Sequence, residues 1–372
     1  MIGPPVEALQ RRHDALGRRL ASVPVDVLVV SHRPNIGYLS HFFGSAGYLV
    51  FAPGHLTLIS DSRYAGVLEG LARQIPVIEA EIVWPGTVST EERLAETLAG
   101  TEARRIGFEP SALTVSEFEG LKRRCADRRG DIEWVPVADA VEDLRVVKDG
   151  AELHVIREAG RRLSDVSKCI IPNVLAGISE RELAAVIEFE LRRKGFDRAA
   201  FDTIVASGPN AAVPHHRAGD RVLADGDLVV VDFGGVLREY SVDMTRTVTV
   251  GRPTARQQVC WDTVAAAQRA AFARSQAGVA ADDVDGAARA VFETAGVGEA
   301  FGHGLGHGLG LEVHERPRLS RRRAGLEGEA IAAGMVFTLE PGIYFPGWGG
   351  VRIEDDVVVT ESGPEWLTEP VT

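Results

Sequence analysis

The sequence predicts a mixed α/β (α+β) protein of two domains, the second built around an internal repeat. The chain has 372 residues, which exceeds the size at which a single hydrophobic core usually stops growing. Strand-like apolar runs alternate with helical patterns up to about residue 140, and glycine-punctuated strands dominate after about residue 200. Such alternation is typical of an α/β domain. We therefore expect one domain at residues 1–143 and another at 144–372.

Composition and charge narrow the class of protein. With 45% hydrophobic and 25% charged residues, the chain has the make-up of an ordinary soluble globular protein. Its net charge of −12 disfavours a nucleic acid as the main partner. The first residues, MIGPPVEALQRRHD, lack the apolar core of a signal peptide, and no apolar run approaches the ~20 residues that span a bilayer. Three well-separated cysteines are expected to be buried thiols, so we expect a cytoplasmic protein without a membrane partner.

The first domain is expected to begin with three strands. The runs VDVLVVS (25–31), GYLVFAP (47–53) and HLTLISD (55–61) are rich in β-branched and aromatic residues and are separated by turn residues. Helical patterns lie between and after them. This order supports an α/β domain.

Helices are expected at the start and in the middle of the second domain. The charged stretch 142–163 places Val147 and three later apolar residues at helical spacing, with residues 148–150 as its cap. The stretch 179–195 opens with a capping box, Ser179 followed by Glu182. Two alanine-rich helices are expected between about 254 and 295.

The second half contains a weak internal repeat at an offset of 108 residues. LADGDLVVVDFG (223–234) aligns with IAAGMVFTLEPG (331–342), and each copy ends an apolar strand with a carboxylate before a turn. The register matches Gly226 with Gly334, Asp232 with Glu340, and Gly234 with Gly342.

These two carboxylates follow apolar strands directly. Carboxylates are rarely buried unless paired or bound to a metal, because desolvating the ion is costly. One such residue alone would mark an exposed strand end. Asp243 lies eleven residues after Asp232 in a second strand-like run, and Gly234-Gly235 between them suits a hairpin turn. We therefore expect the two aspartates to face each other across neighbouring strands.

A similar return strand is expected after Glu340. In VRIEDDVVV, strand alternation places Arg352 and Glu354 on one face, opposite Val351 and Ile353. Glu354 is therefore preferred over Asp355 as an inward-facing carboxylate, and Asp356 stays open.

The segment FGHGLGHGLGLEVHE (301–315) supplies histidines. A helix would make His303 and His307 an i, i+4 metal pair, but five glycines from 302 to 310 disfavour a helix. In an extended chain the two lie ~13 Å apart, at ~3.3 Å per residue, and cannot share one ion. One of them is expected to ligate while the others, including His314, address substrate. A phosphate-binding loop is disfavoured because GxxxxGK[ST] is absent.

The charge balance of such a site favours two divalent cations. Two Asp, two Glu and one neutral His carry four negative charges. Oxygen ligands with one imidazole suit Mn²⁺, Co²⁺, Fe²⁺ or Zn²⁺. Two ions ~3.5–4 Å apart can hold a bridging hydroxide, so the expected chemistry is hydrolysis.

The motifs DFG…VDMTRT, GHGLGHGLGLEVHE, LEPGIY and GVRIEDD resemble those of the pita-bread-fold metallopeptidases, which comprise methionine aminopeptidase, proline dipeptidase (prolidase) and the Xaa-Pro aminopeptidases. NIGYLSHF (35–42) and SDSRYAG (60–66) resemble the creatinase-type N-terminal domain, which argues against methionine aminopeptidase. The resemblance implies a creatinase-like domain at 1–143 and a pita-bread catalytic domain with a pseudo-twofold repeat at 144–372.

The resemblance also implies roles for individual residues. Glu340 would accept the proton of the metal-bound water, and His314 would help to stabilise the oxyanion. His303 and His215 would contact substrate at its proline end. The implied metal ligands, for two ions with Mn²⁺ the leading metal, are Asp232, Asp243, His307, Glu340 and Glu354.

Support for that site is implied for Arg352 and Tyr344, through hydrogen bonds. The role of His216 is open. The resemblance to dimeric relatives implies a homodimer. In such dimers the loop that corresponds to that of His41 can approach the neighbouring subunit's site.

The implied reaction is metal-dependent cleavage of the bond between an N-terminal residue and proline, in a di- or oligopeptide. The amide ahead of proline has no N–H and the ring restricts φ, so a dedicated pocket is needed, and the aromatic loop of 343–355 is expected to wall it. The alternatives are a same-fold, creatinase-like hydrolase or lyase for a small non-peptide substrate, and a non-catalytic binding module. Retention of all five ligand positions disfavours a metal-free enzyme and a module. Dipeptidase and aminopeptidase activity stay equally open.

Overall fold

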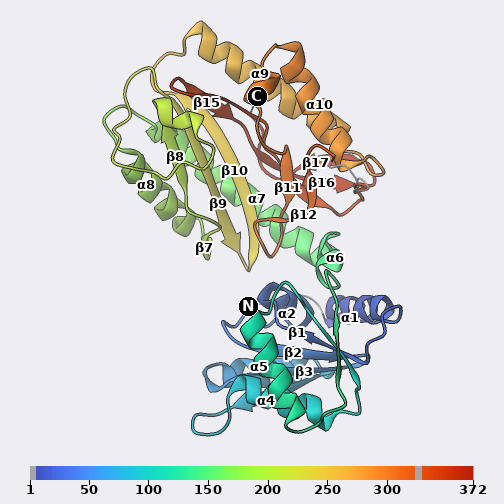
Figure 1. The fold of residues 1–372 in the computed structure, drawn as a ribbon. Helices are drawn as coiled ribbons and strands as arrows, with labels where there is room; N and C mark the ends of the chain where they lie inside the picture. Colours follow the sequence, from blue (N-terminus) through green and yellow to red (C-terminus); the bar gives the residue numbers. More distant parts are fainter. Residues whose placement is uncertain (1–5, 323–328, 372) are drawn as a thin grey trace. The chain divides into compact units, whose positions relative to one another are not determined.

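The chain folds into two compact units in the computed structural model, Met1–Arg145 and Val146–Thr372 (Figure 1). The structure describes residues 6–322 and 329–371. Residues 1–5, the beginning of the segment considered above for a signal peptide, lie outside the described residues. The division falls close to the expected border between residues 143 and 144.

The described part of the N-terminal unit contains a six-stranded sheet in the order β4-β3-β2-β1-β5-β6. The β1–β2 and β2–β3 pairs are antiparallel, whereas β3–β4, β1–β5 and β5–β6 are parallel. The three strands expected from the sequence are confirmed as β1, β2 and β3. The strands are β1 (Val27–Val30), β2 (Tyr48–Ala52), β3 (His55–Asp61), β4 (Ile78–Val83), β5 (Arg105–Phe108) and β6 (Glu133–Pro136).

Helices connect these strands and bury apolar faces. Leu94 and Leu98 of α4 and Leu121 of α5 pack with Val29 and Ile106 of the sheet in one buried cluster. This confirms the expected α/β domain. The helices are α1 (Val6–Leu20), α2 (Arg33–Ser40), α3 (Ala65–Gln74), α4 (Thr90–Gly100), α5 (Val115–Ala126) and α6 (Glu142–Arg145), with a 3₁₀ turn η1 at Ser62–Tyr64.

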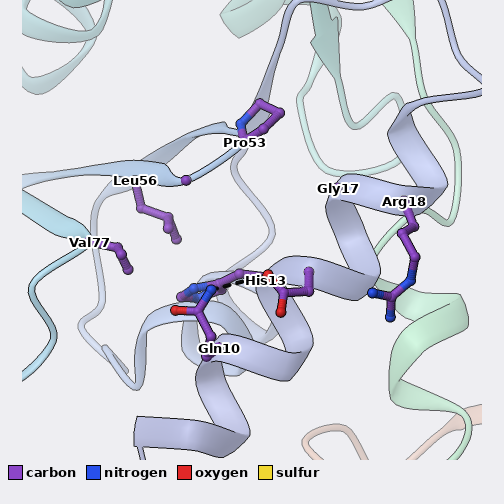
Figure 2. A pocket seen from close by; sticks show the side chains of 9 residues that line it. Gln10, His13, Gly17, Arg18, Pro53, Leu56 and Val77 are labelled. Atoms are coloured by element: carbon purple, nitrogen blue, oxygen red, sulfur yellow. Dashed lines mark hydrogen bonds between the residues drawn. The ribbon is translucent and has the colours of Figure 1, made fainter.

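A cavity of about 290 Å³ lies in this unit between α1 and the β2–β3 turn (Figure 2). Gln10 and Asp14 of α1 are hydrogen-bonded at 3.1 Å beside it. Its lining contains none of the site residues expected from the sequence, so the candidate site lies elsewhere. The lining residues are Gln10, His13, Asp14, Gly17, Arg18, Pro53, Gly54, Leu56 and Val77.

The C-terminal unit contains two main sheets, each with its own helix pair (Figure 1). In the first, β9 pairs with β7, β8 and β10. The second has the order β12-β11-β13-β16-β17, and β14 and β15 form a separate hairpin. The strands are β7 (Arg198–Ala199), β8 (Ile204–Ser207), β9 (Leu228–Leu237), β10 (Tyr240–Thr249), β11 (Gly306–Gly308), β12 (Glu315–Leu319), β13 (Val336–Leu339), β14 (Gly342–Phe345), β15 (Gly349–Arg352), β16 (Asp355–Thr360) and β17 (Gly363–Trp366).

Helices α7 and α8 pack beside the first sheet, and α9 and α10 pack beside the second. An isolated bridge between Thr245 of β10 and Glu354 links the two sheets. The strand ends that carry the expected carboxylates therefore meet where the two sheets adjoin. The helices are α7 (Gly150–Ile170), α8 (Glu180–Arg193), α9 (Ala255–Arg274) and α10 (Ala281–Thr294), with 3₁₀ turns η2 (Ile171–Asn173), η3 (Gly208–Ala212) and η4 (Gly298–Ala300).

The expected helices are confirmed, with one change. Ser179 and Glu182 form the expected capping box of α8, and α9 and α10 occupy the alanine-rich stretch. Asp149 caps α7. The sequence interpretation that 142–163 is one helix is wrong, because α6 ends at Arg145 and Val147 instead bridges Met335 in extended conformation.

The backbone repeats the pattern seen in the sequence. Gly226 and Gly334 precede β9 and β13 and have φ of 87° and 90°, a left-handed conformation that glycine adopts without strain. The amide of Gly226 donates to the carbonyl of Val250, and the amide of Gly334 donates to that of Val359, at 2.8 Å in both cases. The glycine before β9 and the glycine before β13 thus have the same backbone conformation, and each donates to a residue near the end of the paired strand, β10 or β16.

The hairpin between Asp232 and Asp243 differs from the expectation. Gly234 and Gly235 lie inside β9, and the turn is at Arg238-Glu239, whose φ values are 48° and 72°. Two positive φ values are those of a type I′ turn, which fits the twist of paired strands. The strands are therefore longer than the glycine pair suggested.

Two further expectations concern cysteines and membranes. Cys125 and Cys260 are buried free thiols, as expected, whereas the free thiol of Cys169 is only partly buried. Among the described residues, no helix has the length and apolar character needed to cross a bilayer.

Candidate metal centre and active site

Three side chains from separate elements meet where the two sheets adjoin. Ligand atoms of Asp243 on β10, His307 on β11 and Glu354 between β15 and β16 all lie within 4.8 Å of one another. Glu340, directly after β13, joins them through its Oε1, which lies 3.5 Å from Nε2 of His307. The structure therefore brings four of the five expected ligands into one cluster.

Asp232 completes this group from the neighbouring strand. In the β9–β10 register Asp232 lies opposite Thr245, and Asp243 lies opposite Gly234. Residues at these positions share one face of the sheet. The two aspartates are diagonal neighbours rather than the directly facing pair that the sequence suggested.

The buried carboxylates of this cluster repel one another. Burial, followed by the charge of Glu354, raises the pKa of Asp243 well above its usual range. Burial and the charge of Glu340 do the same to the pKa of Glu354. Burial raises the pKa of Glu340 to about 8, with the Arg352 charge opposing and the Asp232 charge adding to the rise. Such a group is unfavourable unless cations compensate it.

Two carboxylate oxygens in the cluster are open for such cations. Oδ1 of Asp232 and Oε1 of Glu354 are buried and have no hydrogen-bond partner among the described residues. Buried polar atoms normally have partners. Oxygen donors of this kind together with one imidazole fit divalent transition-metal ions.

His307 has the geometry of a ligand, and His303 does not. Strand β11 is extended, which confirms that this glycine-rich segment is not a helix. Nδ1 of His307 lies 3.1 Å from the carbonyl oxygen of Gly308, which leaves Nε2 facing the carboxylates. Burial and then the His314 charge lower the pKa of His307 to about 4, so the ring is neutral near pH 7, as ligation requires.

His303 faces another partner. Its Nε2 lies 3.0 Å from the hydroxyl of Tyr344, and its Nδ1 lies 2.8 Å from the carbonyl oxygen of Gly304. Arg352 Nη1 donates to the same Tyr344 hydroxyl at 3.0 Å. His303, Tyr344 and Arg352 thus form a line that leads from the edge of the cluster to Asp232.

Arg352 is the buried cation of this site. Nη2 donates to Oδ2 of Asp232 at 2.5 Å, and Nε donates to Oγ1 of Thr245 at 3.2 Å. Thr245 in turn donates to Oε2 of Glu354 at 2.6 Å. Arg352 therefore fixes one oxygen of Asp232 and, through Thr245, one of Glu354.

The three consecutive acidic residues Glu354, Asp355 and Asp356 make different contacts. Asp355 accepts from Arg246 at 2.7 Å and from Thr368 at 2.7 Å, on the side away from the cluster. This agrees with its place on the apolar face in the sequence. Asp356 accepts from the amide of Asp243 at 3.0 Å, so all three are buried but only Glu354 joins the ligand cluster.

Two exposed histidines border the cluster. The ring of His314 lies 4.3 Å from that of His307 in a T-shaped arrangement. Partial burial and then the charge of His215 lower the pKa of His314, so His215 lies within electrostatic range. His216, whose role was open, points elsewhere: its Nε2 lies 2.8 Å from Oε2 of Glu180.

The aromatic residues of the loop expected to wall the proline pocket make two separate sets of contacts. Trp348 and Phe345 lie 5.5 Å apart, and Arg256 of α9 covers them, at 4.0 Å from the Trp348 ring centre. Strand alternation in β14 turns Phe345 away from the face that Tyr344 occupies, and the expected aromatic wall of the proline pocket stays a prediction. Tyr344 alone of the three contacts the other expected site residues.

Some supporting residues escaped the sequence interpretation. Nε2 of Gln268 on α9 donates to the carbonyl oxygens of Leu339 and Ile353, at 3.1 and 3.4 Å, and to Asp355 at 3.1 Å. It therefore holds the residues that precede Glu340 and Glu354. A glutamine in an alanine-rich helix gave no signal of this, whereas Arg246 lies within the VDMTRT motif and could have been noticed.

Comparison with protein families gives two matches along the chain. Residues 154–361 match the model of Metallopeptidase family M24. Residues 12–147 match the Creatinase/Prolidase N-terminal domain. The first match alone covers more than half of the chain and contains all five expected ligand positions.

Individual proteins are similar over nearly the whole length. An Xaa-Pro dipeptidase of Pyrococcus horikoshii is 34% identical over 346 residues, which covers 93% of each chain. The solved structure of an Xaa-Pro dipeptidase from Bacillus anthracis has a TM-score of 0.89 and 32% identity, covering 98% of both chains. An X-Pro aminopeptidase from Thermotoga maritima has a TM-score of 0.84 and 34% identity, covering 95% of this chain and 98% of its own.

Proposed function

We propose that this chain, which belongs to metallopeptidase family M24 and carries the creatinase/prolidase N-terminal domain, is an Xaa-Pro peptidase. It is a peptidase with the pita-bread fold, and its family implies divalent metal cofactors. The proposed reaction is hydrolysis of the peptide bond between an N-terminal residue and proline. Relatives and structural neighbours that are Xaa-Pro dipeptidases or aminopeptidases support this reaction.

The observation that carries the proposal is the buried carboxylate–imidazole cluster with its unpartnered oxygens. We propose that two divalent ions are held there by Asp232, Asp243, His307, Glu340 and Glu354. Mn²⁺ is the proposed metal, because four carboxylates and one imidazole form an oxygen-rich set without thiolate. When bound, such ions supply an activated water and polarise the scissile carbonyl.

Glu340 is the proposed proton acceptor. Its carboxylate is largely buried beside His307, where it can take a proton from the attacking water and return it to the leaving nitrogen. Arg352 opposes the rise in the pKa of Glu340 that burial causes. The proton acceptor must be ionised before the water attacks, and bound metal ions favour the ionised form of Glu340.

His314 is the proposed donor to the carbonyl oxygen of the substrate. Its pKa is lowered, first by burial, so the neutral ring donates through one N–H and stabilises the charge that develops there. His215 and His303 are proposed to contact the proline end, with Tyr344 fixing the orientation of His303 at 3.0 Å. These roles need no aromatic wall from Phe345 or Trp348.

We also propose a homodimer in a reducing, cytoplasmic compartment. Free thiols at Cys125, Cys169 and Cys260 support the compartment, and the resemblance to dimeric relatives supports the assembly. Light scattering of the purified protein tests the dimer.

Assay of metal-reconstituted protein tests the reaction. Protein stripped of metal and reloaded with Mn²⁺, Co²⁺ or Zn²⁺ is given Ala-Pro, a longer peptide beginning Ala-Pro, and Ala-Ala as control. We expect cleavage of at least one proline substrate and little of Ala-Ala. The preferred length distinguishes dipeptidase from aminopeptidase, and failure on every proline peptide with all three metals contradicts the proposed function.

A further inference from the structure

The segment of residues 207–219, here called the His215 segment, forms one border of the candidate site. It leaves β8 at Ser207, passes through η3 and carries the exposed His215. The carbonyl oxygen of Pro214 accepts from Nη1 of Arg352 at 3.3 Å. The position of His215 therefore depends on how this irregular segment is held, because coil has no ladder of its own to fix it.

One buried carboxylate holds the segment at both ends. Glu180 is the first residue of α8, and its side chain has no solvent exposure. Its Oε1 accepts from Ser207 N at 2.8 Å, from Ser207 Oγ at 2.6 Å and from Asn210 Nδ2 at 2.9 Å. Its Oε2 lies 2.8 Å from Nε2 of His216 and accepts from the amide of Gly219 at 3.2 Å.

These five contacts fill the acceptor capacity of a carboxylate, which has about four lone-pair sites. Burial opposes ionisation of Glu180, but hydrogen bonds from Ser207, Asn210 and His216 outweigh it and keep the pKa below its usual value. The group is thus an ionised, acceptor-only anchor. An amide in its place would turn an NH₂ group toward two or three of the same donors.

The contacts are directed at the segment rather than at the hydrophobic core. Among the described residues, the hydrogen-bond partners of the Glu180 carboxylate all belong to residues 207–219. Arg221 also holds the start of this segment, since it donates to Ser207 Oγ at 2.6 Å and to Asp227. His216 is the neighbour of His215 in the chain. Holding its ring against Glu180 therefore restricts the backbone from which His215 projects.

We propose that Glu180, acting through His216, is a positioning residue that sets where His215 meets the substrate. The proposal rests on the proposed function for its substrate and concerns substrate binding rather than metal binding or proton transfer. Neither Glu180 nor His216 belongs to the carboxylate–imidazole cluster. Their loss should therefore raise KM while kcat and metal content change little, which is the signature of lost binding common to ground and transition states.

The test compares Glu180→Gln with Glu182→Gln in the full-length, metal-loaded protein. Glu182 lies two residues after Glu180 in the first turn of α8, and its carboxylate accepts from Ser179 in the capping box. The Glu182 variant therefore controls for the loss of a carboxylate at the start of the helix. A second pair, His216→Gln and His216→Phe, keeps or removes the N–H donor to Glu180. Hydrogen exchange of residues 207–219, bound metal and the two kinetic constants for a proline dipeptide are measured.

We expect faster exchange across 207–219 in Glu180→Gln and His216→Phe, with KM raised about tenfold and kcat changed less than about threefold. His216→Gln and Glu182→Gln should stay near wild type in both. Unchanged exchange in Glu180→Gln, or an equal KM change in Glu182→Gln, overturns the proposal; should Glu180→Gln fail to fold, equal kinetics of the two His216 variants overturns it. If wild-type protein cleaves no proline peptide, the proposed function fails, and the exchange data alone decide whether Glu180 holds the segment.

Discussion

Arg352 donates through Nη2 to Oδ2 of Asp232 at 2.5 Å, and both side chains are buried. The contact occupies one oxygen of the aspartate and leaves Oδ1 buried without a partner among the described residues. A single guanidinium therefore turns the open oxygen of Asp232 toward the other carboxylates. The same guanidinium reaches Tyr344 and Thr245, so it orients three groups at once.

Replacing Arg352 by Lys should separate charge from geometry. Lysine keeps the positive charge but cannot span Asp232, Tyr344 and Thr245 with a planar fork. We expect kcat/KM to fall by about 10–100-fold, the range seen when partners of metal ligands are removed. Arg256→Lys, at the Trp348 ring, is the control and should keep near-normal activity. Wild-type kinetics in Arg352→Lys would show that charge alone suffices.

The two neighbouring histidines should differ in their effect on metal binding. His307→Ala removes a ring whose Nε2 faces Glu340 at 3.5 Å, and we expect its metal affinity to fall more than the about 10–100-fold typical of an outer partner. His314→Ala should retain metal and lose turnover. Elemental analysis after dialysis against a weak chelator measures both, and the reverse order would assign the ligand role to His314.

Gln268 should matter although it touches no ligand directly. Gln268→Leu leaves the carbonyl oxygens of Leu339 and Ile353 and a carboxylate oxygen of Asp355 without their donor, and unsatisfied buried groups cost about 1–3 kcal/mol each. We expect a lower melting temperature and weaker metal binding. Gln258→Leu on the same helix, where the side chain donates to the exposed Asp262, is the matched control; equal metal affinity in both variants would contradict the role.

Metal should reverse the pH dependence of stability. In the metal-free protein the folded-state pKa values of Asp243 and Glu354 are raised and that of Glu340 is about 8. The folded state then binds more protons than the unfolded state between about pH 4 and 8, so its stability falls as pH rises through that window. Metal-loaded protein, with these carboxylates ionised, should instead lose stability on acidification.

Thermal unfolding with and without Mn²⁺, at pH values from about 5 to 8, measures this difference. The difference in melting temperature should widen as pH rises. Parallel pH profiles of the two forms would mean that the acidic cluster does not bind the ion.

Local sequence rules predicted the first three strands and the capping box of α8 because these depend on residues close in the chain. Asp232 and Glu340 were found through the internal repeat, whose matched glycines Gly226 and Gly334 have nearly equal φ. The β9–β10 turn was misplaced because Arg238 and Glu239 adopt left-handed φ without the usual glycine or asparagine signal. The sequence pattern therefore predicted the features that depend on strand alternation and on burial.

Contacts between distant residues could not be predicted in this way. Glu180 and His216 are 36 positions apart, and Gln268 and Asp355 are 87 apart. Their meeting depends on how α8 and α9 pack, not on local propensity. The choice of His307 over His303 likewise came from the family resemblance, and the geometry that supports it arises from the extended β11.

The central claim is that the cluster around Asp243 holds the metal on which peptide hydrolysis depends. Metal content and Xaa-Pro cleavage, measured on the same samples of wild type, Asp243→Asn and the exposed control Asp262→Asn, test it most directly. We predict that Asp243→Asn loses bound metal and activity together while Asp262→Asn keeps both. Full activity of Asp243→Asn, or of wild-type protein freed of metal, would contradict the claim.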